Sequence, residues 1–86
     1  MARPKKFRRV EFFPDVTYFI PWGKPKCEIE ETVLNIEELE AMRLRDIEKL
    51  TQEECAEKMN VSRQTFQNII DSAREKVSKA LVDGRS

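Results

Sequence analysis

The clearest hydrophobic pattern in this chain lies in its C-terminal third. Apolar side chains recur there at intervals of three and four residues, which is the spacing of one face of an α-helix. The members of this stripe are Phe66, Ile69, Ile70, Ala73, Val77, Ala80 and Leu81. The stripe predicts a long helix near residues 62–82, with Ser62 as its N-cap and Gly84 ending it. We expect Phe66 to be the key core residue of this helix.

A shorter helix is predicted directly before the long one, near residues 51–59. Thr51 and Glu54 have the spacing of a capping box, in which each side chain accepts a hydrogen bond from the backbone N–H of the other residue. The apolar residues that follow share one helix face, and they are Cys55, Ala56 and Met59. Because Ala56 is small, a second helix can cross close to it.

A tight turn at residues 59–62 joins these two helices. Asn60 lies where the first helix must end, and Asn adopts the left-handed conformation more readily than most residues. Val61 is expected to fill the angle between the helices. The short helix, the turn and the long helix together predict a helix-turn-helix.

An earlier helix is predicted near residues 35–47. Asn35 and Glu38 repeat the capping-box spacing at its start. Its apolar residues spread over a wide arc, which predicts a well-buried helix, and they are Ile36, Leu39, Met42, Leu44 and Ile47. The predicted fold class is therefore mainly α, with a three-helix helix-turn-helix domain over residues 35–86.

Residues 1–34 form a basic and aromatic N-terminal arm that precedes this domain. Four prolines interrupt the arm, so extended pieces and turns are favoured over helix. Its residues 10–26 carry five of the seven aromatic side chains of the protein, which are Phe12, Phe13, Tyr18, Phe19 and Trp22. So many rings either cover the helical core, form a dimer or partner surface, or stack on nucleic-acid bases.

The charges of this 86-residue chain are segregated, although its net charge is zero. Residues 1–26 hold seven basic and two acidic side chains, and residues 59–86 hold five and three. Residues 27–58 hold four basic and eleven acidic side chains. Basic ends around an acidic middle are compatible with a protein that turns one side toward DNA.

The sequence offers no catalytic or metal-binding constellation. It has no histidine, and its two cysteines, Cys27 and Cys55, are too few for a zinc site. No apolar run approaches the roughly 20 residues that a membrane span needs, and no signal peptide is evident. We expect no metal, no cofactor, no disulfide, no membrane association and no enzyme activity, and a cytoplasmic location.

The polar face at the start of the long helix is the candidate binding site. Amides, a hydroxyl and a guanidinium at a helix N-terminus suit the base edges and phosphates of a DNA major groove. Base contacts are assigned to Arg63, Gln64, Gln67 and Asn68, and phosphate contacts to Ser62 and Thr65. The alternative is an ordinary solvated helix face, which is polar in any protein.

A second candidate site is the basic start of the arm. Residues 1–9 carry five basic side chains, which are Arg3, Lys5, Lys6, Arg8 and Arg9. They either bind DNA beside the helix-turn-helix, where such arms enter the minor groove, or serve as a solubilising tail.

Residues 35–82 resemble the helix-turn-helix of sigma factor region four, and the stretches 50–62 and 72–81 carry the likeness. The whole chain is similar to a family of small prokaryotic proteins of unknown function that are predicted to bind DNA. The matching motifs are Arg3-Pro4, Arg8-Arg9-Val10, Phe19-x-Pro21-x-Gly23, Glu38-Leu39-Glu40-Ala41, Leu50-Thr-Gln-Glu-Glu, Ser62-Arg63-Gln64-Thr65-Phe66 and Leu81-Val82-x-Gly84. Lys49 and Asn60 stand where relatives usually have Gly, and Phe7 stands where they often have Cys.

The polar helix face and the resemblance lead to two hypotheses. The first is a sequence-specific protein that binds double-stranded DNA, alone or as a homodimer, and regulates transcription. It would read the major groove with the helix that starts near Ser62. The alternative is a protein-protein interaction module on the same scaffold, with the aromatic arm as its binding surface. An affinity for DNA that falls steeply with salt distinguishes the first hypothesis from the second.

Overall fold

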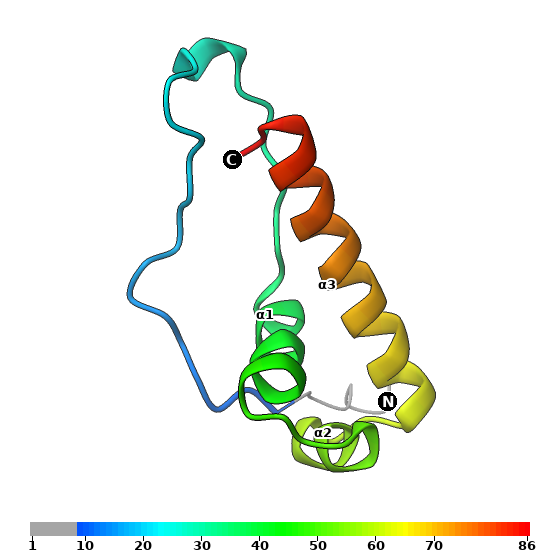
Figure 1. Cartoon of the computed structure of the whole chain (residues 1–86). Coiled ribbons are helices and arrows are strands. Elements are labelled where there is room, and N and C mark those ends of the chain that lie inside the picture. Colours follow the sequence, from blue (N-terminus) through cyan, green and yellow to red (C-terminus); the bar gives the residue numbers. More distant parts are fainter. Residues whose placement is uncertain (1–8) are drawn as a thin grey trace, which may run out of the picture.

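The computed structural model describes residues 9–86, and its regular structure is helical throughout that part of the chain. Two short turns and three α-helices follow one another without a strand among the described residues (Figure 1). In chain order they are the 3-10 turn η1 (Lys26–Glu28), α1 (Ile36–Met42), the π-helical turn η2 (Arg43–Ile47), α2 (Gln52–Met59) and α3 (Arg63–Asp83). The mainly α, three-helix prediction is confirmed.

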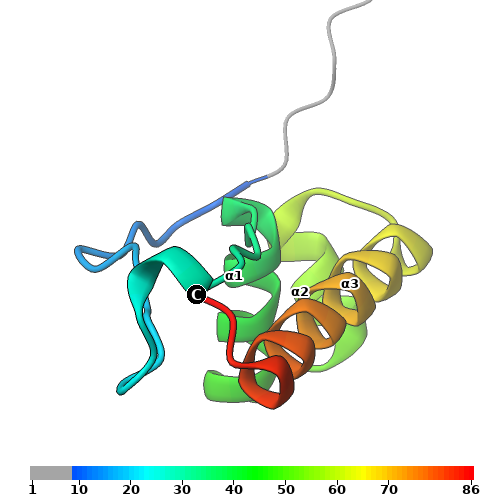
Figure 2. The same cartoon turned by 90° about the horizontal axis from the view of Figure 1, so that it is seen from above.

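The starts of α2 and α3 are stabilised by the capping residues that the sequence predicts. The Thr51 hydroxyl accepts from the backbone N–H of Glu54 at 3.2 Å, and the Glu54 carboxylate accepts from that of Thr51 at 2.9 Å. Asn60 ends α2 in the left-handed conformation with φ 58°, and Ser62 caps α3. As a result α2 crosses the N-terminal end of α3, in a helix-turn-helix arrangement (Figures 1 and 2).

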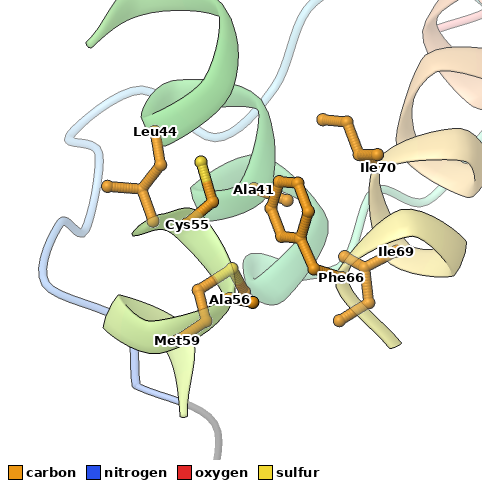
Figure 3. Packing of buried hydrophobic residues seen from close by; sticks show 8 residues of the cluster. All are labelled: Ala41, Leu44, Cys55, Ala56, Met59, Phe66, Ile69 and Ile70. Carbon is orange, nitrogen blue, oxygen red and sulfur yellow. The ribbon is translucent and has the colours of Figure 1, made fainter. Parts of the chain in front are cut away.

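Phe66 lies at the centre of the core and is completely buried. Its ring projects from α3 toward Ala41 of α1 and toward α2 (Figure 3). The buried cluster consists of Ala41, Leu44, Cys55, Ala56, Met59, Phe66, Ile69 and Ile70, with Met42, Leu50 and Val61 packed against it. The free thiol of Cys55 therefore serves as a small apolar core group, and Cys27 is exposed, so the two cysteines form no disulfide.

The apolar stripe of α3 is buried over only half its length. Ala73 is fully buried, but Leu81 is 79% exposed, so the prediction that Leu81 faces the core is wrong. The reason is that α1 and α2 both pack on the N-terminal part of α3, and its C-terminal turns extend past them (Figure 1).

The first helix differs from its prediction in winding and in burial. It begins with the expected cap, in which the Asn35 backbone N–H donates to Glu38 at 2.8 Å, but it continues from Arg43 as the π-helical turn η2. The wider turn shifts the phase of the residues after it. Ile47, at the end of this turn, is consequently exposed. Ile36 lies at the start of α1, before the turn, and is exposed as well, so the expectation of a well-buried helix is wrong for these two residues.

Lys49 closes this corner in the left-handed conformation, with φ 61°. A side chain with a Cβ atom costs about 1 kcal/mol there. The corner is nevertheless fixed, because the Leu50 backbone N–H donates to the Leu44 carbonyl at 3.1 Å.

Residues 10–26, which carry the five aromatic side chains and which we call the aromatic segment, lie apart from the core. Phe13 is 70%, Phe19 75% and Trp22 100% exposed, so of the alternatives left open for the aromatic rings, covering the helical core does not apply to these three. The segment is tied at its two ends instead. Near its start the Arg9 backbone N–H donates to the Met59 carbonyl, and beyond its end the backbone of residues 30–32 pairs with Ser86. Between these ties the chain runs as an extended loop beside α1 and α3 (Figure 1).

Candidate nucleic-acid interface

The polar residues predicted to contact DNA lie together at the N-terminal end of α3. Arg63, Gln64 and Asn68 are exposed, whereas Thr65 and Gln67 are half-buried. Ser62, at the N-cap, is exposed as well. These six residues, 62–65 with Gln67 and Asn68, form what we call the reading face. Because Phe66 points into the core, the reading face looks away from α1.

Gln64 and Asn68 form a pair on this face. The Gln64 side-chain amide donates to the Asn68 side-chain oxygen at 3.1 Å. Each amide can form about four hydrogen bonds, so this single bond leaves both with donors and acceptors for a ligand. Both residues of the pair are exposed.

The two hydroxyls of the reading face are not equivalent. Ser62 Oγ accepts from the Thr65 backbone N–H at 3.1 Å and donates to Thr65 Oγ1 at 2.9 Å. Its only proton is therefore used within the protein. The hydroxyl proton of Thr65 is free to donate to a phosphate oxygen.

Carboxylates flank the reading face and reduce its positive charge. Arg63 lies 3.4 Å from the Glu53 carboxylate, with both side chains about two-thirds exposed. Asp71 accepts from the Gln67 amide at 2.9 Å, one turn further along α3. These carboxylates weaken any electrostatic attraction of an anion to this face, whereas its exposed amides keep hydrogen-bonding groups for a ligand.

Gln52 is a member of this site that the sequence analysis missed. It is the first residue of α2, and its side chain bonds to both Arg63 and Gln67 of α3. The only signal in the sequence is its place directly after the N-cap Thr51, which does not predict bonds to residues 11 and 15 positions away.

The start of the described chain is fastened beside the helix-turn-helix. Besides the Arg9 bond to α2, the Glu11 backbone N–H donates to the Glu40 carboxylate at 3.0 Å. Phe12 lies under the Arg43 guanidinium at 5.7 Å. Arg9 itself is exposed. The other predicted arm residues, Arg3, Lys5, Lys6 and Arg8, lie outside the described residues.

Two buried carboxylates hold this assembly together, and the sequence pattern did not predict the burial of either. Glu38 is 3% and Glu40 2% exposed. Glu40 accepts two hydrogen bonds from Arg43, at 2.7 and 3.0 Å. Glu38 accepts from Ser72 at 2.6 Å and from Lys76 at 2.8 Å, and so joins α1 to α3.

These contacts keep both carboxylates ionised. Burial alone would raise the pKa of Glu38, but the hydrogen bonds from Lys76, Ser72 and the Asn35 backbone outweigh it, and the pKa is lowered. The pKa of Glu40 is lowered in the same way, with Arg43 as the main partner. A carboxylate with a depressed pKa stabilises the fold above its unfolded pKa, and this stabilisation is lost as the pH falls through the folded pKa.

We expect Glu38→Gln to lower the free energy of unfolding by about 1–2 kcal/mol at neutral pH, because Lys76 loses a charged acceptor. The difference from the wild type should shrink as the pH falls below about 5, where the Glu38 carboxyl of the unfolded wild type becomes protonated. Urea unfolding at pH 7 and pH 3 measures both effects. Glu57→Gln, at an exposed position of α2, is the matched control, and an equal loss in both variants would contradict the role of Glu38.

Within residues 9–86, no group of three or more His, Cys, Asp or Glu side chains is placed to hold a metal ion. In the same part of the chain, every helix is too short or too polar to cross a membrane.

Fold and site define a small helical protein with a helix-turn-helix arrangement and an amide-rich face on its last helix. The chain belongs to a family described as "Protein of unknown function DUF134", whose profile matches residues 1–86. This finding confirms the predicted likeness to a family of unknown function.

Several related sequences from clostridia carry the name UPF0251 protein. One from Clostridium tetani (strain Massachusetts / E88) is 77% identical over 86 residues, which are 100% of this chain and 58% of the relative. Another from Clostridium botulinum (strain Hall) is 73% identical over all of this chain and 55% of the relative. The chain thus spans a little over half the length of these relatives. No solved structure matches it significantly, so the likeness to sigma factor region four rests on sequence motifs alone.

Proposed function

We propose that this protein binds double-stranded DNA in a sequence-specific way and regulates transcription. The observation that carries the proposal is the exposed Gln64–Asn68 amide pair at the start of a capped helix, with α2 crossing behind it. A helix presented in this manner fits the width of the major groove. The family assignment is compatible with this function and adds no argument for it.

The groups of the reading face divide into two roles under this proposal. Gln64, Gln67 and Asn68 offer amides that match the N6 and N7 edge of adenine, and Arg63 can reach guanine. Thr65 supplies a hydroxyl to phosphate, and the backbone N–H groups at the start of α3 add to it. Each role requires binding and no bond breaking, so we propose a binding protein and not an enzyme.

We place the basic arm at the same DNA. The bond from Arg9 to Met59 brings the chain to the C-terminal end of α2, next to the turn that leads into α3. The Glu11 carboxylate lies 3.7 Å from Lys58 of the same helix. A basic segment that starts there would reach the backbone or minor groove beside the site read by α3.

The proposal is tested by titrating fluorescent duplex DNA at several salt concentrations. We expect the binding constant to fall steeply as salt rises. Deleting residues 1–8 should flatten the slope of log K against log salt by about 0.9 for each phosphate that the shortened protein no longer neutralises. The deletion should weaken binding to preferred and random duplexes alike, since phosphate contacts carry no sequence information. A wild-type protein without salt-dependent binding would refute the proposed function. If the deletion variant binds with an unchanged salt slope, the arm is a solubilising tail.

A specific observation favours the protein-protein interaction module as the second candidate. Two apolar hollows of about 440 and 470 Å³ lie beside the aromatic segment. The first faces residues 31–34 and the start of α1, and the second faces α1 and the C-terminal half of α3. Exposed Phe19 and Leu81 line the second hollow. Uncovered apolar surface of this kind is typical of interaction sites. A homodimer formed through it would leave the reading face free, because the hollow lies along the C-terminal half of α3.

A further inference from the structure

A chain of side-chain hydrogen bonds runs from α2 along the reading face. Arg63 Nε donates to Gln52 Oε1 at 3.3 Å, and Gln52 Nε2 donates to Gln67 Oε1 at 2.6 Å. Gln67 Nε2 then donates to Asp71 Oδ1 at 2.9 Å. We call these four residues, Arg63, Gln52, Gln67 and Asp71, the amide relay. It links the first residue of one helix to two turns of the next.

The two ends of the amide relay fix its direction. A guanidinium can only donate hydrogen bonds and an ionised carboxylate can only accept them. Gln52 must therefore turn its oxygen toward Arg63, and Gln67 must turn its nitrogen toward Asp71. The remaining bond, from the Gln52 nitrogen to the Gln67 oxygen, is then the only one compatible with both ends. Neither amide can flip without losing two hydrogen bonds.

The fixed direction has a consequence for base recognition. Gln67 uses one N–H and one oxygen lone pair within the relay, so one donor and one acceptor remain. Their order along the groove is set by Asp71 and Gln52. An adenine offers an acceptor and a donor side by side, and their order reverses when an A·T pair is replaced by T·A. A locked amide distinguishes the two orientations, whereas a freely flipping amide accepts both.

We propose that Gln52 and Asp71 are positioning residues that set the base preference of Gln67 without touching DNA bases themselves. This assignment rests on the proposed DNA binding and deepens it. Gln52 also occupies Nε of Arg63, which leaves the outer nitrogens of the guanidinium to face a ligand. In the free protein, one of those outer nitrogens lies 3.4 Å from the Glu53 carboxylate.

The first test compares two variants that each remove one negative charge from α3. Asp71→Asn removes the acceptor-only end of the relay, since an Asn amide can donate as well. Glu75→Gln, at an exposed residue paired with Lys79, lies outside the relay. Both should raise the affinity for any duplex. Only Asp71→Asn should lose discrimination between A·T and T·A at one base pair, by roughly five-fold or more. Equal effects of the two variants on base preference would overturn the proposal.

The second test separates positioning from direct contact at Gln52. Gln52→Ala should relax the preference at the same base pair, and it should have no further effect on that preference in a Gln67→Ala background. A uniform loss of affinity for all duplexes would instead make Gln52 a phosphate contact and would overturn its positioning role.

A third measurement needs no DNA. In the free protein, Gln52→Ala and Asp71→Asn should each shift the side-chain amide resonances of Gln67, and Glu75→Gln should not. Unshifted resonances would overturn the relay even when the wild type binds DNA. Shifted resonances in a protein that shows no salt-dependent binding to duplex DNA would support the relay, refute the proposed function and thereby refute the role in base preference.

Discussion

Phe66→Ala is expected to lower the free energy of unfolding by about 3–5 kcal/mol, the usual cost of removing a fully buried aromatic ring. Because natural domains are stable by only about 5–15 kcal/mol, most of the stability of this small protein would be lost. The ring lies between all three helices, so no single helix can move in to fill the cavity.

Urea unfolding followed by circular dichroism measures this effect. Phe13→Ala is the matched control, because it makes the same chemical change at a ring that is 70% exposed. We expect the control to unfold within about 0.5 kcal/mol of the wild type. A Phe66→Ala protein as stable as the control would mean that Phe66 does not hold the three helices together.

Local signals explain why the helix-turn-helix could be predicted from the sequence. The cap of α2 depends on Thr51 and Glu54, which are three residues apart, and the cap of α3 on Ser62 and Thr65. The turn depends on one left-handed residue, Asn60. Such features need only the neighbouring chain, so the spacing of residue types is enough to find them.

Contacts between residues that are far apart in the sequence could not be predicted from such local spacing. Glu38 is an ordinary helix-start carboxylate by its spacing to Asn35, yet its burial depends on Ser72 and Lys76, which are 34 and 38 residues away. Similarly, Leu81 continues the periodicity of Phe66, but no helix reaches far enough along α3 to cover it. Periodicity predicts which face of a helix is apolar and does not predict how much of that face finds a partner.

The same contrast between local signals and distant contacts holds for the candidate site. The shared face of Gln64 and Asn68 follows from their separation of four residues, and the structure joins them by a hydrogen bond. The part played by Gln52 depends on how α2 packs across α3, around Ala56 and Phe66, and local spacing alone does not predict this packing.

Replacing both Gln64 and Asn68 with alanine is expected to reduce discrimination between the preferred DNA site and random duplexes by roughly 2–4 kcal/mol. Each amide can supply a paired contact to adenine, and such a contact contributes about 1–3 kcal/mol of discrimination. Affinity for random DNA should change little, because under the proposed function Thr65, the start of α3 and the basic arm would still contact phosphates. Folding should be nearly unaffected, since both residues are exposed and alanine favours helix.

Competition titrations with labelled preferred and random duplexes measure the ratio of the two affinities. Ser78→Ala, at an exposed position of the same helix, controls for the change in helix propensity and should leave the ratio unchanged. If the double variant keeps its sequence preference, the outermost amides of α3 do not read bases. The apolar hollow between the aromatic segment and α3 would then be the stronger candidate for the binding surface, because the exposed side chains of Phe19 and Leu81 line it.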